Sequence, residues 1–235
     1  MHVTFRGKRP EAANIYTFEW ERPEDFNYQA GQYIKLLLPH QNADERGEMH
    51  WFTLSSSPSE SYLSNTTKFS QPSSTFKQTL IALEPGAKAE MTGPFGEFVL
   101  PEDAAQKLVF VAGGIGVTPY RSILKWLNDK DQTRPIQLLY AANQPRELAF
   151  RSLFDHLPKP MEVTYLVSKP NAGWSGQVGQ LSGEKIQELS NGLENKLTYL
   201  SGPKPMVQAF KDQLLELGIN EAKIITDFFP GYEKI

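Results

Sequence analysis

The alternation of apolar and polar residues predicts strands in the first part of the chain. Residues 12–21 (AANIYTFEWE) switch between apolar and polar at nearly every step, which is the period of a half-buried strand. The predicted strands cover 2–6, 12–21, the stretch from the turn at Ala30-Gly31 to Leu38, 50–55, 62–69, and 87–91 with a turn leading into 93–101. Six short strands of this kind favour a small antiparallel Greek-key barrel.

One stretch inside this region has a helical period instead. Apolar residues at 76, 80 and 83 are spaced as on one face of a helix. Ser74 or Thr75 can cap its start, and Glu84-Pro85-Gly86 ends it. We therefore predict one helix, over residues 75–83, within the barrel region.

After residues 101–106 (PEDAAQ) the pattern changes to apolar runs alternating with helical segments. Such alternation predicts a parallel sheet with helices on both faces. We place the domain boundary so that 1–102 form the barrel and 103–235 a five-stranded parallel α/β domain. The predicted strands of the second domain cover 108–112, 136–142, 162–167, 197–200 and 223–228, and its predicted helices cover 118–127, 146–157, 183–189 and 204–217.

Composition narrows the classes of function. The chain has 235 residues, a net charge of -3 and no cysteine. The slight acidity disfavours a general nucleic-acid or membrane-surface binder, and the absence of cysteine excludes a disulfide framework, a cysteine nucleophile and a cysteine-held metal centre on this chain. No metal site is predicted. The first residues lack the apolar core of a signal peptide and no run is long enough for a membrane helix, so we expect a cytoplasmic protein.

The stretch LVFVAGGIGVTP, residues 108–119, is the candidate for chemistry. Glycines let backbone amides approach a phosphate, and the start of the following helix favours negative charge. The spacing is not the G-x-G-x-x-G of the usual dinucleotide fingerprint. From these residues alone, a phosphate cradle and a tight strand-to-helix turn without a ligand are equally supported.

Four motifs occur in order along the chain. They are GPFGEF at 93–98, GGIGVTP at 113–119, SGPKPM at 201–206 and DFFPGY at 227–232. Together they resemble the ferredoxin–NADP reductase superfamily, in which the last three usually read G-G-x-G-x-[ST]-P, C-G-P-x-x-M and E-x-F. The resemblance covers nearly the whole chain. It implies a barrel that binds FAD, a second domain that binds NAD(P)H, and hydride transfer between the two cofactors.

The flavin motif of that family, R-x-Y-[ST], reads His50-Trp51-Phe52-Thr53 here. The resemblance implies that Phe52 stacks on the flavin and that the Thr53 hydroxyl meets flavin N5. His50 stands where relatives have an arginine that contacts the phosphates, and it replaces a permanent charge by a group that is largely neutral at pH 7. FMN therefore stays open as an alternative to FAD, and a strand histidine with a local hydrogen bond is the alternative for His50.

The second flavin element of the family is a helix start that donates amides to the pyrophosphate, and residues 74–77 (STFK) occupy it. Lys77 could offset the missing arginine, and Lys68 is a further phosphate or ribityl neighbour. A solvated face is the alternative for both lysines. The residues expected to contact the flavin are His50, Trp51, Phe52, Thr53, Thr67, Lys68, Ser74, Thr75, Phe76, Lys77 and Phe229.

The nicotinamide nucleotide is expected on the second domain. Relatives that use NADP hold its 2′-phosphate with a Ser-Arg pair after the third strand, and Ser168-Lys169 occupies that place. The lysine, without an acidic neighbour for the ribose hydroxyls, favours NADPH over NADH; a surface lysine is the alternative. The residues expected to contact the nucleotide are Gly114, Gly116, Thr118, Pro119, Ser168, Lys169, Ser201, Gly202, Pro203 and Met206.

The resemblance implies a hydride site made of Thr53, Ser201 and Asp227, each a shorter or softer version of the family residue. We expect a flavoprotein oxidoreductase that passes electrons from NAD(P)H to a separate carrier such as ferredoxin or flavodoxin, because the cysteine-free chain holds no iron–sulfur module of its own. Two alternatives stay open. One is a flavin-binding electron-transfer or regulatory subunit of a larger complex, and the other is a free flavin reductase that releases its flavin.

Overall fold

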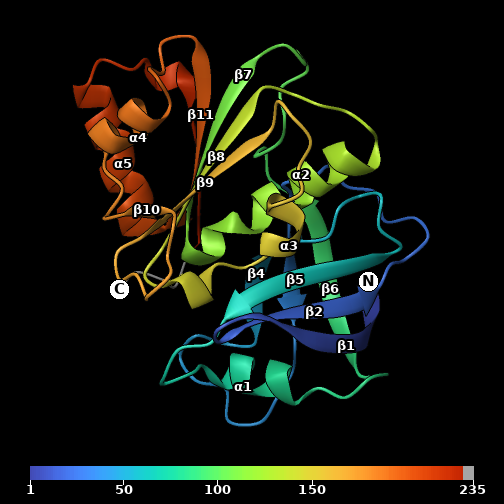
Figure 1. Ribbon diagram of the computed structural model, residues 1–235. Helices are drawn as coiled ribbons and strands as arrows, with labels where there is room; N and C mark the ends of the chain where they lie inside the picture. Colours follow the sequence, from blue (N-terminus) through green and yellow to red (C-terminus); the bar gives the residue numbers. More distant parts are fainter. Residues whose placement is uncertain (230–235) are drawn as a thin grey trace. The chain divides into compact units, whose positions relative to one another are not determined.

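The computed structural model describes residues 1–229, which divide into two compact units. The first unit contains residues 1–99 and 118–126, and the second contains residues 100–117 and the chain from 127 onwards. Figure 1 shows the elements of both units, which are described separately below. In the part of the chain from 1 to 229, no helix is both long and apolar enough to cross a membrane.

The first unit is built on a six-stranded antiparallel sheet, as predicted. The strand predicted within 93–101 is wrong beyond residue 95, where the last strand of this unit ends, and the first strand continues to residue 12 instead of ending at residue 6. An isolated antiparallel bridge between Leu54 and Asn65 links strand β5 to the end of strand β4 and brings the two edge strands of the sheet together, as a barrel requires. The strands, in the spatial order β4-β3-β6-β1-β2-β5, are β1 (His2–Ala12), β2 (Ile15–Glu21), β3 (Tyr33–Leu37), β4 (Met49–Thr53), β5 (Tyr62–Lys68) and β6 (Lys88–Phe95).

The core of this unit forms because alternate strand residues point inward. Phe18 and Trp20 of β2 are fully buried and pack with Phe5 of β1, whose ring centroid lies 5.2 Å from that of Trp20. Helix α1 (Thr75–Ala82) adds Phe76 and Leu80 to the same core, which matches the predicted helical face. Apolar burial at these positions is the main stabilising contribution of the unit.

The second unit contains a six-stranded parallel sheet, not the five-stranded sheet predicted from the sequence. The additional strand, β10, has only two residues and pairs with the end of β9, so it is too short to give a periodic signal. The strands, in the order β10-β9-β8-β7-β11-β12, are β7 (Lys107–Gly113), β8 (Ile136–Ala142), β9 (Glu162–Val167), β10 (Gln177–Val178), β11 (Lys196–Pro203) and β12 (Ile224–Phe229).

Helices cover the two faces of this sheet. Helices α4 (Gly183–Leu189) and α5 (Lys204–Glu216) bury Ile186, Phe210 and Leu214 in a core with inward residues of the strands. On the other face, Phe154 of the short helix α3 (Arg151–Phe154) packs edge-on against Tyr140 of β8 at 6.3 Å between ring centroids.

The predicted helix over 146–157 is wrong. A 3₁₀ turn, η2 (Pro145–Glu147), is followed by Phe150 in the left-handed region at φ 61°, which separates the turn from α3. The amide of Ala149 donates to the buried Tyr140 hydroxyl at 3.0 Å instead of joining a helix. A tertiary hydrogen bond has therefore overridden the local helical pattern.

Gly31 has a backbone conformation and a close contact that no other residue type would tolerate well. Its φ is +103°, and a Cβ built there would lie 2.0 Å from the Phe98 carbonyl oxygen. We expect Gly31→Ala to lower the free energy of unfolding by about 2 kcal/mol or more, because it adds a clash to a strained backbone conformation. Gly7→Ala, at a strand position with no atom within 4 Å of the new Cβ, is the matched control. Urea unfolding curves compare the two, and equal midpoints would contradict the prediction.

Candidate functional site

The HWFT segment lies on edge strand β4, whose alternation separates its side chains onto two faces. Phe52 is 8% exposed and lies with His50 against Phe76 of α1, at ring-centroid distances of 5.8 Å and 4.2 Å from Phe76 respectively. Trp51 is 47% exposed on the other face, where the Lys35 ammonium lies 4.5 Å from its ring centroid. The structure thus brings three of the predicted flavin residues, His50, Phe52 and Phe76, into one aromatic cluster.

His50 does not carry the charge of the arginine it replaces. Burial lowers the pKa of its imidazole, which favours the neutral form. Its Nε2 atom is buried and has no hydrogen-bond partner among residues 1–229. A buried polar atom without a partner is costly, so this nitrogen is suited to meet a group that is not part of the chain.

The start of α1 receives an anion from the chain itself. Ser74 caps the helix by accepting from the Lys77 amide at 3.1 Å, as predicted. The Thr75 amide donates to a carboxylate oxygen of Asp44 at 3.0 Å, and the Asp44 amide donates back to the Thr75 hydroxyl at 3.0 Å. Arg46 holds the same carboxylate at 2.6 Å. These contacts lower the pKa of the Asp44 carboxyl, with the Arg46 hydrogen bond as the largest cause.

Sequence reasoning missed Asp44 and Arg46. Both lie in the polar loop between β3 and β4, and nothing in their local pattern links them to a helix thirty residues further on. Their contacts show that the predicted phosphate-binding helix start does bind an anionic oxygen. The residues therefore fit the phosphates of a flavin, provided that the Asp44 carboxylate yields its place.

The two predicted lysines lie beside this helix start. The Lys77 ammonium donates to the Lys68 carbonyl at 2.7 Å, so the side chain of Lys77 reaches back to the end of β5. Thr67, the preceding residue, is 2% exposed. The hydrogen bonds of Lys77 thus link the end of β5, at Lys68, with the start of α1, at Ser74. Thr67 is the neighbour of Lys68 on β5.

The glycine turn connects β7 to helix α2 (Thr118–Asp129) through a 3₁₀ turn, η1 (Gly114–Val117). A Cβ on Gly116 would lie 2.2 Å from the Ser201 carbonyl oxygen, and one on Gly113 would lie 2.2 Å from the Met206 sulfur. Gly114 adopts φ +53° with open space around it. Gly116 is thus required by its close approach to the backbone at the end of β11, whatever ligand the turn holds, whereas a side chain at Gly113 would meet the flexible side chain of Met206 on α5.

This packing joins two of the predicted motifs at the carboxyl ends of neighbouring strands. Ser201 of β11 is in register with Ala112 of β7, so the SGP segment lies beside the glycine turn. The chain proceeds from β7 to β8 and β9 on one side, and it returns to β11 and β12 on the other. Ligands of open parallel sheets bind where the strand order reverses in this way.

Two of the three predicted catalytic residues are direct neighbours. Ser201 and Asp227 are register partners on β11 and β12. Ser201 is fully buried, and its hydroxyl has no hydrogen-bond partner within the described residues. Desolvation raises the pKa of Asp227 to about 6 although the side chain is partly exposed. A carboxyl with such a pKa can hold or release a proton near neutral pH.

The other predicted residues have different surroundings. Thr53 is 4% exposed and belongs to the first unit, as does Thr118, which is 2% exposed at the start of α2 with Pro119 next to it. Lys169 is exposed after the end of β9, and its amide donates to the Asn143 carbonyl at 2.8 Å. The Ser168 hydroxyl lies 3.4 Å from the side-chain oxygen of Asn143. Sequence reasoning missed Asn143. The side chain of Phe229 lies outside the described part of the structure.

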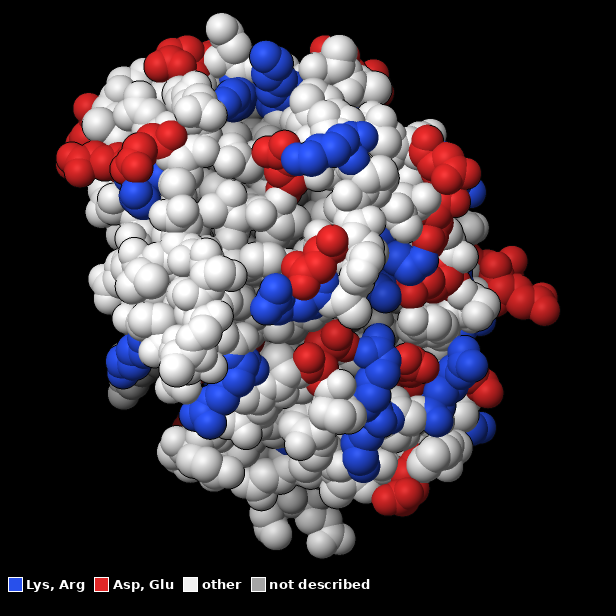
Figure 2. Space-filling model, in the orientation of Figure 1, with Lys and Arg blue, Asp and Glu red and all other residues white. Residues whose placement is uncertain are grey.

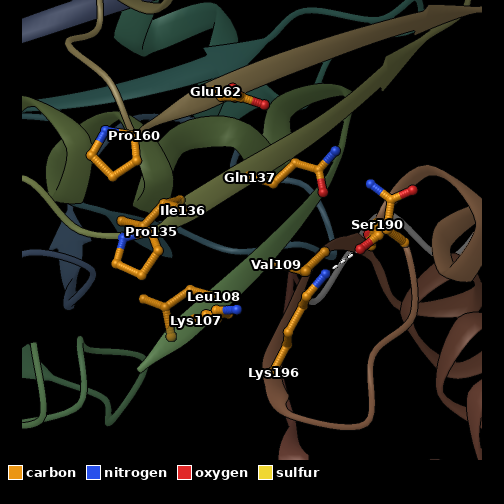
Figure 3. A pocket seen from close by; sticks show the side chains of 11 residues that line it. Lys107, Leu108, Val109, Pro135, Ile136, Gln137, Pro160, Glu162, Ser190 and Lys196 are labelled. Carbon is orange, nitrogen blue, oxygen red and sulfur yellow. Dashed lines mark hydrogen bonds between the residues drawn. The ribbon is translucent and has the colours of Figure 1, made fainter. Parts of the chain in front are cut away.

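A separate pocket of about 180 Å³ lies at the opposite, amino-terminal edge of the parallel sheet (Figure 3). Lys107, Gln137, Glu162 and Lys196 line it from the first residues of β7, β8, β9 and β11. The Lys196 ammonium donates to the Ser190 carbonyl there. Because none of the predicted site residues lines this pocket, it is not the site that the motifs indicate.

Surface charge gives no sign of a polyanion-binding face. On the face drawn in Figure 2, acidic side chains (red) and basic side chains (blue) are intermingled. This distribution agrees with the net charge of -3. A large basic field, which would attract nucleic acid, is not a feature of that face.

Comparisons with known proteins agree with these observations. Residues 110–212 match the family model described as the oxidoreductase NAD-binding domain. The chain is 25% identical to the stachydrine N-demethylase reductase subunit of Rhizobium meliloti, with 96% of this chain and 66% of that protein covered. It is 26% identical to NADH-cytochrome b5 reductase 1 of Ajellomyces capsulatus, with 90% and 72% covered.

One solved structure illustrates the shared fold. The FAD/NAD-binding domain of nitric oxide dioxygenase from Vibrio cholerae superposes with a TM-score of 0.82 at 24% identity, and 97% of this chain and 98% of that chain are covered. The chain spans about two thirds of the demethylase reductase subunit. The two-domain arrangement of a barrel followed by a nucleotide-binding domain is therefore shared over almost the full length of this chain.

Asp227 gives a pH-dependent prediction. Its folded pKa is raised from 3.8 to about 6, so between these values the native chain keeps a proton that the unfolded chain has released. The contribution of this carboxyl to stability is therefore greatest below about pH 4 and is lost as the pH rises through 6. We expect Asp227→Asn to gain stability relative to the parent protein over this range, by roughly 2 kcal/mol at pH 7. Urea unfolding at pH 4, 5, 6 and 7 measures the gain.

Asp25→Asn is the control, because Asp25 is exposed and the substitution removes the same single charge. A difference between Asp227→Asn and the parent protein that stays constant from pH 4 to 7 would contradict the raised pKa.

Proposed function

Because this chain belongs to the ferredoxin–NADP reductase superfamily, we propose that it is an FAD-dependent NAD(P)H oxidoreductase that delivers electrons to a separate redox protein. The observation that carries the proposal is that the glycine turn and the SGP segment lie side by side at the switch point of the parallel sheet. There the buried Ser201 hydroxyl, which has no partner in the described part of the chain, adjoins Asp227, whose pKa is raised to about 6. Unpartnered and titratable groups at the carboxyl ends of parallel strands are typical of a reactive site.

The first unit supplies the flavin contacts in this proposal. The start of α1 and the Lys77 and Lys68 pair would hold the phosphates, and the unpartnered His50 nitrogen would meet the same part of the cofactor. Thr53, at the end of β4, would place its hydroxyl near flavin N5. A bound flavin supplies the ability to accept a hydride and to release electrons singly.

The second unit and the first residue of α2 supply the nucleotide contacts in this proposal. Gly114, Gly116 and Thr118 would meet the pyrophosphate, and Ser201 to Pro203 with Met206 would line the nicotinamide end. Ser201 would donate its free hydroxyl to the bound ring, and Asp227 would hold or release a proton beside it. The task of these residues is to keep the nicotinamide at near-attack distance, about 3–3.5 Å, from its acceptor atom.

NADPH is the nucleotide we favour. Lys169 is exposed directly after β9 beside Ser168, and a lysine ammonium there favours a 2′-phosphate over bare ribose hydroxyls. The reductase of Ajellomyces capsulatus carries NADH in its name, so the family itself does not decide this point. The charge of Lys169 is the argument for this chain.

The electron acceptor would be another protein. We propose a partner such as ferredoxin or flavodoxin, because the 235 residues hold no cysteine that could bind an iron–sulfur cluster. The relative from Rhizobium meliloti is named as a reductase subunit of a demethylase, which fits the same division of labour.

A free flavin reductase is the second candidate, and two features of the first unit favour it. Asp44 and Arg46 occupy the helix start that would hold flavin phosphates, and His50 offers no positive charge there. Both features weaken the retention of a flavin. An enzyme that uses flavin as a substrate needs such weak binding.

The absorbance spectrum tests the proposal most directly. After loading with FAD and gel filtration, we expect the protein to keep a yellow flavin band near-stoichiometrically and to lose it on anaerobic titration with NADPH. Loss of the flavin on the column with continued reduction of added flavin would support the free flavin reductase. A colourless protein that oxidises neither NADPH nor NADH would refute both.

Lys169→Ala tests the nucleotide preference. We expect the KM for NADPH to rise by about tenfold, equivalent to about 1.4 kcal/mol, while the KM for NADH stays the same, because only NADPH carries the phosphate. Lys130→Ala removes an exposed lysine between α2 and β8 and is the matched control. Steady-state diaphorase assays with an artificial acceptor give the values, and equal changes for both nucleotides would argue against a 2′-phosphate contact.

A further inference from the structure

Helix α2 carries a buried ion pair that the proposed site does not use. Arg121 is 8% exposed, and its guanidinium forms two hydrogen bonds to the carboxylate of Glu60 in the loop after β4. The Nη2–Oε1 distance is 2.9 Å, and Nη1 also donates to the Ser55 carbonyl at 2.9 Å. Both partners belong to the first unit. A two-pronged contact of this kind fixes orientation as well as distance.

The loop that carries Glu60 is itself held in place. The Ser57 amide and the Tyr62 hydroxyl each donate to Glu60 at 2.7 Å, which orients the carboxylate. Ser122, the neighbour of Arg121, donates its hydroxyl to the Ser56 carbonyl at 2.5 Å. Helix α2 and the loop 54–60 are thus joined at three successive loop residues, Ser55, Ser56 and Ser57, either directly or through Glu60.

Stability alone does not account for this pair. Removing two charges from water is costly, and an apolar pair of similar volume is often as stable as a buried ion pair or more so. What the charged pair adds is a defined direction, because a guanidinium and a carboxylate meet in one plane. The location of the pair therefore becomes the informative feature.

Each partner lies close in the chain to a segment that the proposed site uses. Arg121 is one helical turn after Thr118, the residue that ends the glycine turn. Glu60 closes the loop that begins directly after Thr53, whose hydroxyl is proposed to meet flavin N5. The pair therefore connects the helix that continues from the nucleotide turn with the loop that continues from the flavin strand.

We propose that Arg121 and Glu60 are positioning residues for hydride transfer. The inference rests on the proposed function. The pair holds the loop after Thr53 in one orientation against the first turn of α2, and it thereby fixes the end of β4, where the Thr53 hydroxyl is proposed to meet flavin N5. Alignment errors of about 1 Å can cost on the order of a hundredfold in rate, so a pair that fixes direction acts on the rate without touching a reactant.

The test compares two variants. One keeps the positive charge of residue 121 but loses its planar geometry, and the other removes both charged groups. Arg121→Lys keeps the positive charge and loses the planar fork. The double variant Glu60→Leu with Arg121→Met removes both charges and keeps apolar volume, which protects the fold. Arg9→Lys alters a pair on β1 and β2 that lies outside the site, where Arg9 contacts Glu11 and Glu19, and is the matched control.

Anaerobic stopped-flow measurement of flavin reduction in the FAD-loaded protein gives the rate constant and the nucleotide Kd separately. We expect Arg121→Lys and the double variant to lower the reduction rate constant by about tenfold to a hundredfold. The nucleotide Kd, the flavin spectrum and the thermal midpoint should change little, and Arg9→Lys should match the parent protein. A larger kinetic isotope effect with 4-deuterated nucleotide should accompany the slower transfer, because poorer alignment makes the hydride step limit the rate.

Each other outcome has a defined meaning. A folded double variant that reduces its flavin within about twofold of the parent rate overturns the positioning role. A loss confined to the nucleotide Kd also overturns it, since the pair then serves binding. If the double variant does not fold, Arg121→Lys decides on the same readouts. A parent protein whose bound flavin is reduced by neither NADPH nor NADH refutes the proposed function itself, and the positioning role falls with it.

Discussion

The second unit depends on the contact of the glycine turn with the end of β11. Gly116 approaches the Ser201 carbonyl so closely that a single added carbon would lie 2.2 Å from it, and Gly113 meets Met206 in the same way. Strands β7 and β11 run side by side to their carboxyl ends, where the buried Ser201 hydroxyl has no hydrogen-bond partner among residues 1–229. The strand order makes this end of the sheet a switch point, and the absence of a side chain at Gly116 allows the turn to lie against the backbone of β11 there.

The first unit solves a different electrostatic problem. Its helix α1 presents amides that favour a negative charge, and the chain satisfies one of them with the Asp44 carboxylate, backed by Arg46. His50 contributes a neutral imidazole with one buried nitrogen that lacks a partner in the described part of the chain. A flavin phosphate would therefore compete with an internal anion. In the proposed function, flavin affinity would be a balance between the Asp44 carboxylate and the cofactor phosphate, without the arginine that the family usually has at the position of His50.

Each of the two units contains a pair of neighbouring polar residues that are wholly or mostly removed from solvent. Arg121 and Glu60 meet in the interior of the first unit, while Ser201 and Asp227 adjoin at the end of the parallel sheet. Burying polar groups costs free energy unless they are hydrogen-bonded or paired. Buried polar groups fix orientation and shift proton affinities, as the raised pKa of Asp227 shows.

The sequence by itself determined the number of antiparallel strands, the single helix α1 and the alternation of strands and helices in the second unit, because hydrophobic periodicity acts locally. It left the cap of α1 open between Ser74 and Thr75, and the structure selects Ser74. The order of its motifs also indicated the superfamily and placed Ser201 and Asp227 in one site. Only the tertiary structure decided the rest. The two-residue β10 exists through pairing alone, Phe150 breaks a helical pattern because Ala149 bonds to Tyr140, and Asp44 reaches Thr75 across thirty residues. Such contacts depend on the surroundings that folding creates, and no local pattern records them.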